Sequence, residues 1–140
     1  MRILFDTNIV LDVLEARAPY HRDAVTLFSA VDRGWLTGLL CATTITTIHY
    51  IARQALGAAK TREQLRKILG MFTIAPVTHG IIVDALELAF PDFEDAVLHE
   101  AAASADAVGI VTRNPKDFHQ SRLRIYSPAS LVASLRTLHP

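Results

Sequence analysis

Short apolar runs alternate with longer amphipathic stretches along the whole chain. The first run begins at Ile3 and ends at Asp6, and each later run likewise ends at a turn or at polar residues. A continuous apolar run of this length is typical of a strand buried on both faces, as in a parallel sheet. We expect strands at residues 3–6, 38–42, 73–76, 108–112 and 124–126.

The stretches between these runs have apolar residues three and four positions apart, which indicates helices with one buried face. Ala24, Leu27, Phe28 and Val31 show this spacing most clearly. We expect a short helix ending at Leu14, followed by helices at residues 20–31, 43–56, 61–71, 81–89, 93–104 and 128–135.

Residues at the expected helix ends support these boundaries. Thr7 or Asn8 is expected to cap the first helix, because a side-chain oxygen there accepts a free backbone N–H. Gly57 is expected to end one helix, and the Thr-Arg-Glu that begins at Thr61 is a partial capping signal for the next. Pro128 suits the first turn of the last helix.

This alternation of strands and helices is typical of a parallel sheet covered by helices on both faces. The chain has 140 residues and is 51% hydrophobic, which suffices for one core and leaves no room for a second domain. We therefore predict a single α/β domain over residues 1–140, a three-layer α/β/α sandwich around a small, mostly parallel sheet.

Composition narrows the classes of protein that fit. The 14 Lys and Arg balance the 14 Asp and Glu, which argues against a broadly basic nucleic-acid binder, although four basic residues cluster at residues 60–67. Cys41 is the only cysteine, so no disulfide framework is expected, and it should pack as a small hydrophobe. No apolar stretch is long enough to span a bilayer. We expect a soluble, cytoplasmic protein.

Acidic and amide residues follow the expected strands. Asp6 ends the first strand, and Asn114 and Asp117 lie just past the strand at residues 108–112. Asp92 and Asp95 stand at the start of a helix. If these ends converge, they form a cage of hard oxygen ligands that suits Mg²⁺ or Mn²⁺ and disfavours zinc. Such an ion can activate water for phosphodiester hydrolysis.

Each of these residues also has a simpler interpretation. Asp92 lies three residues before Asp95, which is typical of an N-cap. Thr112 either binds a metal-bound water or only ends its strand, and Asn114 either binds the ion or only holds a turn. The candidates are Asp6, Asp95, Asn114 and Asp117 as catalytic residues, the first three also as metal ligands, with Asp92, Thr112, Asn8 and His49 as further candidates.

Three motifs in this order resemble those of PIN-domain nucleases: Asp-Thr-Asn at residues 6–8, Pro-Asp-Phe-Glu-Asp-Ala at residues 91–96, and Val-Thr-Arg-Asn-Pro-Lys-Asp-Phe at residues 111–118. The resemblance covers essentially the whole chain. It implies a Mg²⁺- or Mn²⁺-dependent ribonuclease, often the VapC-type toxin of a toxin–antitoxin pair. By position, Asp6 and Asp95 match the first and third acidic ligands of the family. Asn114 stands where many members have a fourth acid, and Asp117 is near enough to assist.

One position departs from the family pattern. The helix after the second strand usually carries a glutamate, and His49 stands at that position. A neutral imidazole is a poor substitute for a carboxylate on Mg²⁺. His49 shares a helical face with Ile45 and Ile48, so a packed histidine is favoured over a ligand.

We therefore expect a metal-dependent endoribonuclease that cleaves RNA and is held inactive by a small antitoxin protein. The alternative is a non-catalytic PIN-like module that binds RNA or protein through a depleted acidic site. A phosphatase-like hydrolase is disfavoured, because Asn8 replaces the second aspartate of its Asp-x-Asp pair. A homodimer is also expected, because apolar residues lie on more than one helix face: Leu27, Phe28, Trp35, Ile45, Ile48 and Ile51.

Overall fold

Five strands form a single sheet in the computed structural model, which describes residues 1–140. They are β1 (Arg2–Phe5), β2 (Thr37–Cys41), β3 (Thr73–Ala75), β4 (Gly109–Val111) and β5 (Arg124–Tyr126). The spatial order is β3-β2-β1-β4-β5, and every neighbouring pair is parallel. The predicted α/β sandwich is therefore confirmed.

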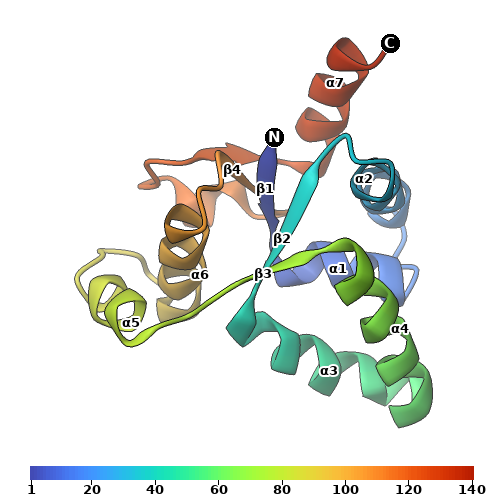
Figure 1. Ribbon diagram of the computed structural model, residues 1–140, viewed down its shortest axis with the longest axis horizontal. Helices are drawn as coiled ribbons and strands as arrows, with labels where there is room; N and C mark the ends of the chain where they lie inside the picture. Colours follow the sequence, from blue (N-terminus) through green and yellow to red (C-terminus); the bar gives the residue numbers. More distant parts are fainter.

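Seven α-helices and one 3₁₀ helix connect and cover the strands (Figure 1). They are α1 (Thr7–Leu14), α2 (His21–Asp32), α3 (Ala42–Leu56), α4 (Ala58–Met71), α5 (His79–Leu86), α6 (Phe93–Ser104), η1 (Pro115–Phe118) and α7 (Pro128–Leu138). None of the helices has both the length and the apolar character that a membrane crossing requires.

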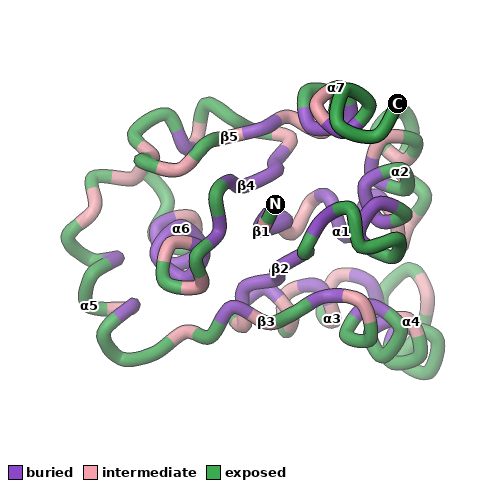
Figure 2. The backbone as a smooth tube through the Cα atoms, turned by 45° about the horizontal axis from the view of Figure 1, so that its top comes forward, coloured by how far each residue is buried: buried purple, intermediate pink, exposed green.

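Successive strand residues point to opposite faces of the sheet and build two separate cores. Ile3 and Phe5 of β1 pack under α1 to α4 and α7, whereas Leu4 packs under α5 and α6. In Figure 1, α5 and α6 lie on one side of the strands, and α1 to α4 lie on the other. The central strands are buried along most of their length (Figure 2). This two-sided burial explains the continuous apolar runs in the sequence.

Several helix boundaries differ from the sequence prediction. Asp6, rather than Thr7 or Asn8, is the N-cap of α1, and its carboxylate accepts the Thr7 N–H. α4 begins at Ala58, because Gly57 at φ 83° lets the chain turn directly from α3 into α4. Thr61 lies inside α4 instead of capping it, and its hydroxyl donates to the Gly57 carbonyl at 2.7 Å. α5 begins earlier than predicted, since Thr78 caps it.

Burial also bears on the expected homodimer. Leu27, Phe28 and Ile48 lie in the protein's own core, so they offer little surface to a second copy. Trp35 is 37% exposed and stacks on the ring of His139. The homodimer stays a prediction that depends on the partly exposed residues. Cys41 is buried and unpaired, which confirms its predicted packing role.

Candidate metal and active site

The strand order fixes where the candidate site forms. After β3 the chain returns to the other side of β1, so the helices that follow β1 and β4 leave in different directions from adjacent strand ends. In open parallel sheets, ligands bind at this kind of switch point, beyond the carboxyl ends of the strands. The pairing of Phe5 with Val111 brings the next residues, Asp6 and Thr112, side by side.

Hydrogen bonds to the backbone N–H and to both carboxylate oxygens hold Asp6 in place. Its backbone N–H donates to the Val111 carbonyl at 3.0 Å, which extends the β1–β4 pairing. One carboxylate oxygen accepts the Thr7 N–H, and the other accepts the Thr112 hydroxyl, both at 2.8 Å. These contacts fix the carboxylate at the start of α1. Thr112 therefore acts as a support for Asp6, and it does not line the cavity itself.

The start of α6 delivers the second carboxylate. Asp92 is the N-cap of α6, and its Oδ1 accepts the backbone N–H groups of Glu94 at 2.8 Å and of Asp95 at 3.4 Å. The predicted capping role of Asp92 is thus confirmed. Asp95 then lies in the first turn of α6, where the positive end of the helix dipole favours an anionic side chain.

The third contribution comes from the 3₁₀ helix η1, which the sequence did not predict. Asn114 precedes it, and the Asn114 backbone N–H donates to the Thr112 hydroxyl at 3.1 Å. Inside η1, the Asp117 N–H donates to the Asn114 carbonyl at 3.0 Å. The turn holds Asn114 and Asp117 on the same edge of the sheet as Asp6.

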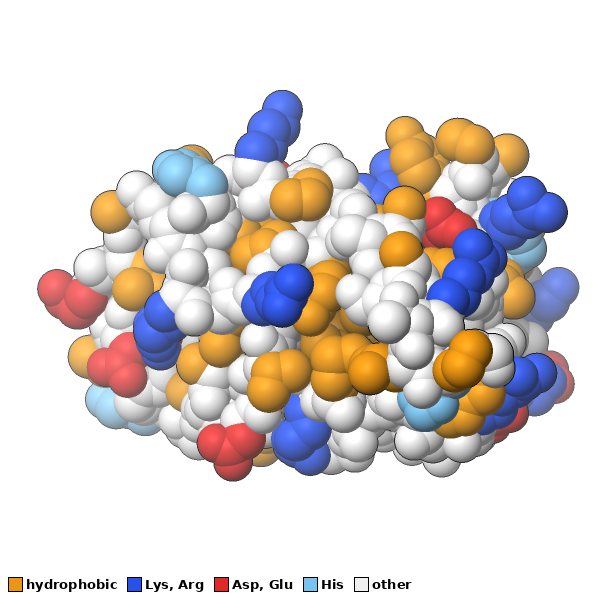
Figure 3. Space-filling view, turned by 90° about the horizontal axis from the view of Figure 1, so that it is seen from above, with side chains coloured by type: hydrophobic (Ala, Val, Ile, Leu, Met, Phe, Trp, Pro, Cys, Tyr) orange, Lys and Arg blue, Asp and Glu red, His pale blue; other side chains and the backbone are white.

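One cavity of about 310 Å³ collects these side chains, and only one of the ten lining residues, Leu11, is hydrophobic. The lining residues are Asp6, Thr7, Asn8, Leu11, Thr47, Asp92, Glu94, Asp95, Asn114 and Asp117. All four catalytic candidates therefore meet, as do the further candidates Asp92 and Asn8. The cavity lies at the edge of the sheet where the strands end. The face at the other edge, where the strands begin, carries scattered Lys and Arg among apolar groups (Figure 3).

His49 does not line this cavity, so the structure does not support it as a metal-ligand candidate. Thr47 of α3 lines the cavity instead. His49 is partly buried, and its Nε2 has no hydrogen-bond partner within the protein. The contribution of α3 is thus a neutral hydroxyl. Sequence alone did not identify Thr47, because the family pattern pointed two residues further along α3.

Two carboxylates of the cavity, those of Asp6 and Asp95, have a raised pKa. Burial and the neighbouring carboxylates of Asp6, Asp92 and Asp117 raise the pKa of Asp95 to about 7. Burial also raises the pKa of Asp6, against the hydrogen bonds from Thr112 and Thr7. For both groups burial is the largest cause of the shift, and for Asp95 like charge is the next.

A second charged cluster, which the sequence analysis missed, supports the turn beside the cavity. Asp12 of α1 is fully buried, and its Oδ2 lies 2.9 Å from Nε of Arg113. The guanidinium of Arg113 also lies over the ring of Tyr20, 4.1 Å from its centre. Burial raises the pKa of Asp12, and Arg113 opposes that shift. The sequence did offer one sign of this cluster, because Asp12 is a charged residue between the apolar neighbours Leu11 and Val13.

The donors in the cavity are all oxygens, which suits Mg²⁺ or Mn²⁺. No three acidic, His or Cys side chains are close enough together to hold a metal ion alone. Mg²⁺ usually keeps several waters and takes one or two carboxylates, so Asp6, Asp95 and the Asn114 amide fit a largely hydrated ion.

The raised pKa of Asp95 predicts how stability depends on pH. Between its ordinary value of 3.8 and about 7, Asp95 holds its proton in the folded state and loses it in the unfolded state. The folded state then binds more protons, so the free energy of unfolding falls as pH rises through this window. Urea unfolding of the metal-free protein should show that fall. Asp95→Asn should reduce it, and a slope as steep as in the wild type would contradict the assignment.

Asp12→Ala should destabilise the protein. It leaves Arg113 without its carboxylate, and because Arg113 still touches water, the cost should be about 2 kcal/mol, below that of a fully buried pair. Asp32→Ala, at an exposed position of α2, is the matched control and should stay within about 0.5 kcal/mol. Urea unfolding measures both. Equal losses would mean that the Asp12–Arg113 pair adds nothing to stability.

Comparisons with solved structures agree with this architecture. A chain from a toxin–antitoxin complex of Klebsiella pneumoniae has a TM-score of 0.70 at 23% identity, over 90% of this chain and 97% of that one. A chain of VapBC2 from Rickettsia felis, bound to a DNA fragment of its promoter, has a TM-score of 0.65 at 16% identity, over 91% and 98%. At these identities the likeness shows a shared fold.

A third similar structure is VapC20 from Mycobacterium tuberculosis, a toxin described as cleaving the sarcin-ricin loop, with a TM-score of 0.63 at 13% identity over 77% of this chain and 86% of that one. A search of curated protein sequences gives no significant match. The family model described as PIN domain matches residues 2–116, which is most of the chain. The protein therefore belongs to the PIN domain family.

Proposed function

We propose that the protein is a metal-dependent endoribonuclease and the toxin of a toxin–antitoxin pair. The observation that carries this proposal is the gathering of carboxylates around one cavity at the switch point of the sheet, where burial and then the neighbouring carboxylates raise the pKa of Asp95 to about 7. Carboxylates brought together at this cost are typical of functional sites. A divalent cation between them would relieve the repulsion.

The residues around the cavity have the following roles in this proposal. Asp6 and Asp95 would hold Mg²⁺ or Mn²⁺, and the Asn114 amide oxygen would add a neutral ligand. Asp117 would orient a water at the site, and Thr112 holds Asp6 in place. The bound ion supplies an activated water and neutralises charge on the phosphate. Asp92 acts as a helix cap that aims Asp95.

RNA is the proposed substrate, because its single-stranded loops expose phosphates and bases to a shallow, open site. Lys116 is exposed on η1 between Asn114 and Asp117, where it can meet a phosphate beside the ion. The similar chain of VapC20, described as a sarcin-ricin loop cleaving toxin, supports this class of activity. We place the reaction in the cytoplasm.

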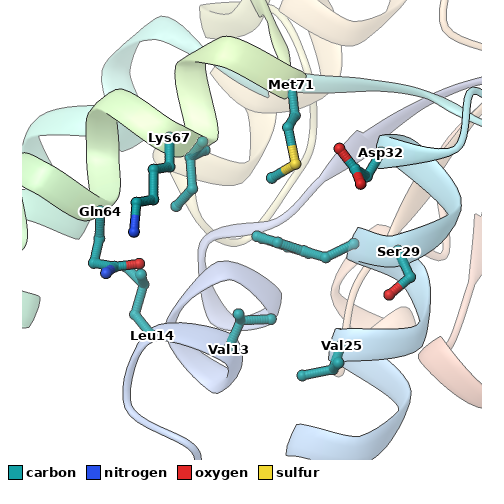
Figure 4. Close-up of a pocket in the computed structure, with 10 residues that line it drawn as sticks. Val13, Leu14, Val25, Ser29, Asp32, Gln64, Lys67 and Met71 are labelled. Carbon is teal, nitrogen blue, oxygen red and sulfur yellow. The ribbon is translucent and has the colours of Figure 1, made fainter.

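A separate groove offers a site for an antitoxin. It measures about 360 Å³, and six of its ten lining residues are hydrophobic. Figure 4 shows Val13 and Leu14 of α1, Val25 of α2 and Met71 of α4 around it. Lys67 stands at its edge. An amphipathic helix fits such a groove, and the likeness to VapBC and other toxin–antitoxin complexes supports an antitoxin as the occupant. We also keep the homodimer as a proposal.

Cleavage should require Asp6. Asp6→Asn keeps a capping side chain at the start of α1 and removes a charge from the metal site, so the thermal midpoint should hardly move. Cleavage of a fluorescent single-stranded RNA in the presence of Mn²⁺ should fall by about a hundredfold or more. Loss of a residue that only supports a metal ligand already costs about tenfold to a hundredfold, and Asp6 is proposed as a ligand itself. Asp32→Asn is the matched control and should retain full activity.

Calorimetric titration of Mn²⁺ separates this proposal from its alternative. Binding by the wild type that weakens in Asp6→Asn supports the metal site, and Thr47→Glu should tighten it, because a carboxylate then faces the cavity. His49→Glu is the control for that gain, since His49 lies outside the cavity. Metal-independent RNA binding without cleavage would instead favour the non-catalytic binding module.

The groove makes its own prediction. Val25 is 38% exposed in the groove, so Val25→Asp should leave the fold intact and place an unpaired charge against an apolar partner. Co-expression with the protein encoded next to this gene should then yield no complex. Val83→Asp, at an exposed site on α5, is the matched control and should still co-purify. Equal recovery of both variants would place the partner elsewhere.

A further inference from the structure

The helices α6 and η1 both bring residues to the acidic cavity, and side chains from α6 and from the segment after η1 also contact each other outside the cavity. α6 carries Asp95, and η1 carries Asp117, yet neither segment pairs with the other through backbone hydrogen bonds. His99 lies one turn after Asp95 on the same face of α6. Ser121 lies three residues after the end of η1, and its N–H donates to the Phe118 carbonyl at 2.9 Å.

A short hydrogen bond joins His99 to Ser121, with Nε2 and Oγ 2.7 Å apart. His99 is 1% exposed, and burial lowers its pKa, so the ring is neutral at pH 7. Nδ1 lies 3.5 Å from a carboxylate oxygen of Glu100, which favours the proton on Nδ1. Nε2 then accepts the Ser121 hydroxyl, while the Ser121 oxygen accepts the Leu123 N–H at 2.8 Å.

Two further contacts reinforce this join. Arg122 donates to both carboxylate oxygens of Glu100, at 3.1 and 3.0 Å, a fork geometry that fixes direction as well as distance. Phe118 of η1 is 1% exposed in the core beneath α6, and its ring meets that of Phe90, which also packs on His99. The segment after Asp117 is thus tied to α6 at three places.

The order Ser121, His99 and Glu100 is similar to that of a hydrolase triad, but the surroundings exclude that role. Ser121 lines none of the four cavities of the protein. Its oxygen is engaged by Leu123, and Nδ1 of His99 lies a long 3.5 Å from the Glu100 carboxylate. A nucleophilic serine needs space beside it for a substrate carbonyl, and there is no such space beside Ser121. The residues form a structural link.

We propose that His99 and Ser121, with Glu100 and Arg122, form a clasp that positions Asp117 and Asn114 opposite Asp95 for metal binding. The inference rests on the proposed metal-dependent function of the cavity. None of the clasp residues lines the acidic cavity, so they are positioning residues. Their hydrogen bonds explain how the segment after a 3₁₀ turn of four residues is held against α6.

Ser121→Ala tests the clasp, because it removes the hydroxyl and keeps the backbone turn. The affinity of Ser121→Ala for Mn²⁺, measured by calorimetric titration, should weaken by about tenfold to a hundredfold. This is the range found when a contact that supports a metal ligand is lost. In the RNA assay, kcat should fall while KM stays near the wild-type value. Ser121→Thr keeps a hydroxyl and should restore Mn²⁺ affinity. Ser130→Ala, at an exposed serine of α7, is the matched control.

The outcomes separate this inference from the proposed function. Wild-type Mn²⁺ affinity in Ser121→Ala, with only a lower thermal midpoint, would overturn the clasp and leave the nuclease proposal intact. Weaker Mn²⁺ binding in Ser121→Ala, rescued in Ser121→Thr, supports the clasp even if the wild type cleaves no RNA. A wild type that binds no Mn²⁺ would overturn both proposals.

Discussion

The hydrogen bond from the Thr112 hydroxyl to Asp6 is the contact on which the rest of the site depends. It exists because β1 pairs with β4 in parallel, with Phe5 opposite Val111, so the residues after the two strands leave the sheet together. It fixes one oxygen of Asp6 and leaves the carboxylate facing the cavity. The same hydroxyl accepts the Asn114 N–H, so Thr112 aligns the segments on both sides of the switch point.

Burial of the carboxylates, together with their mutual repulsion, is an electrostatic cost that the fold has to contain. Asp6 and Asp95 belong to different strand and helix units, and both have raised pKa values. Two helix N-termini help to contain it, because α1 begins at Asp6 and α6 begins beside Asp95, with the positive ends of both dipoles at the cavity. The remaining excess of negative charge favours a cation.

The fold was predictable to a large extent, because buried parallel strands appear in the sequence as continuous apolar runs between helices with regular apolar spacing. The acidic candidates were predictable for the same reason: Asp6 and Asn114 follow strands whose ends must share one edge. Asp95 was found through its motif and through the cap at Asp92. Helix ends were less predictable, as the positive φ of Gly57 let α4 begin three residues before the capping signal at Thr61.

The rest of the site required three-dimensional contacts. Thr47 lines the cavity only because the fold places α3 beside the other strand ends, and no local pattern encodes that placement. The buried pair of Asp12 and Arg113 joins positions about a hundred residues apart, as does the bond between Asp6 and Thr112. The link from His99 to Ser121 depends on where η1 settles on α6, so spacing in the sequence gave no sign of it.

Paramagnetic broadening by Mn²⁺ is the most direct test of the central claim that the acidic cavity is a cation site. In the ¹⁵N-labelled protein, substoichiometric Mn²⁺ should first broaden the amide signals of Asp6, Asp95 and Asn114, and the amides on the opposite face should stay sharp. Broadening that begins at other acidic residues, or spreads evenly over the surface, would contradict the account.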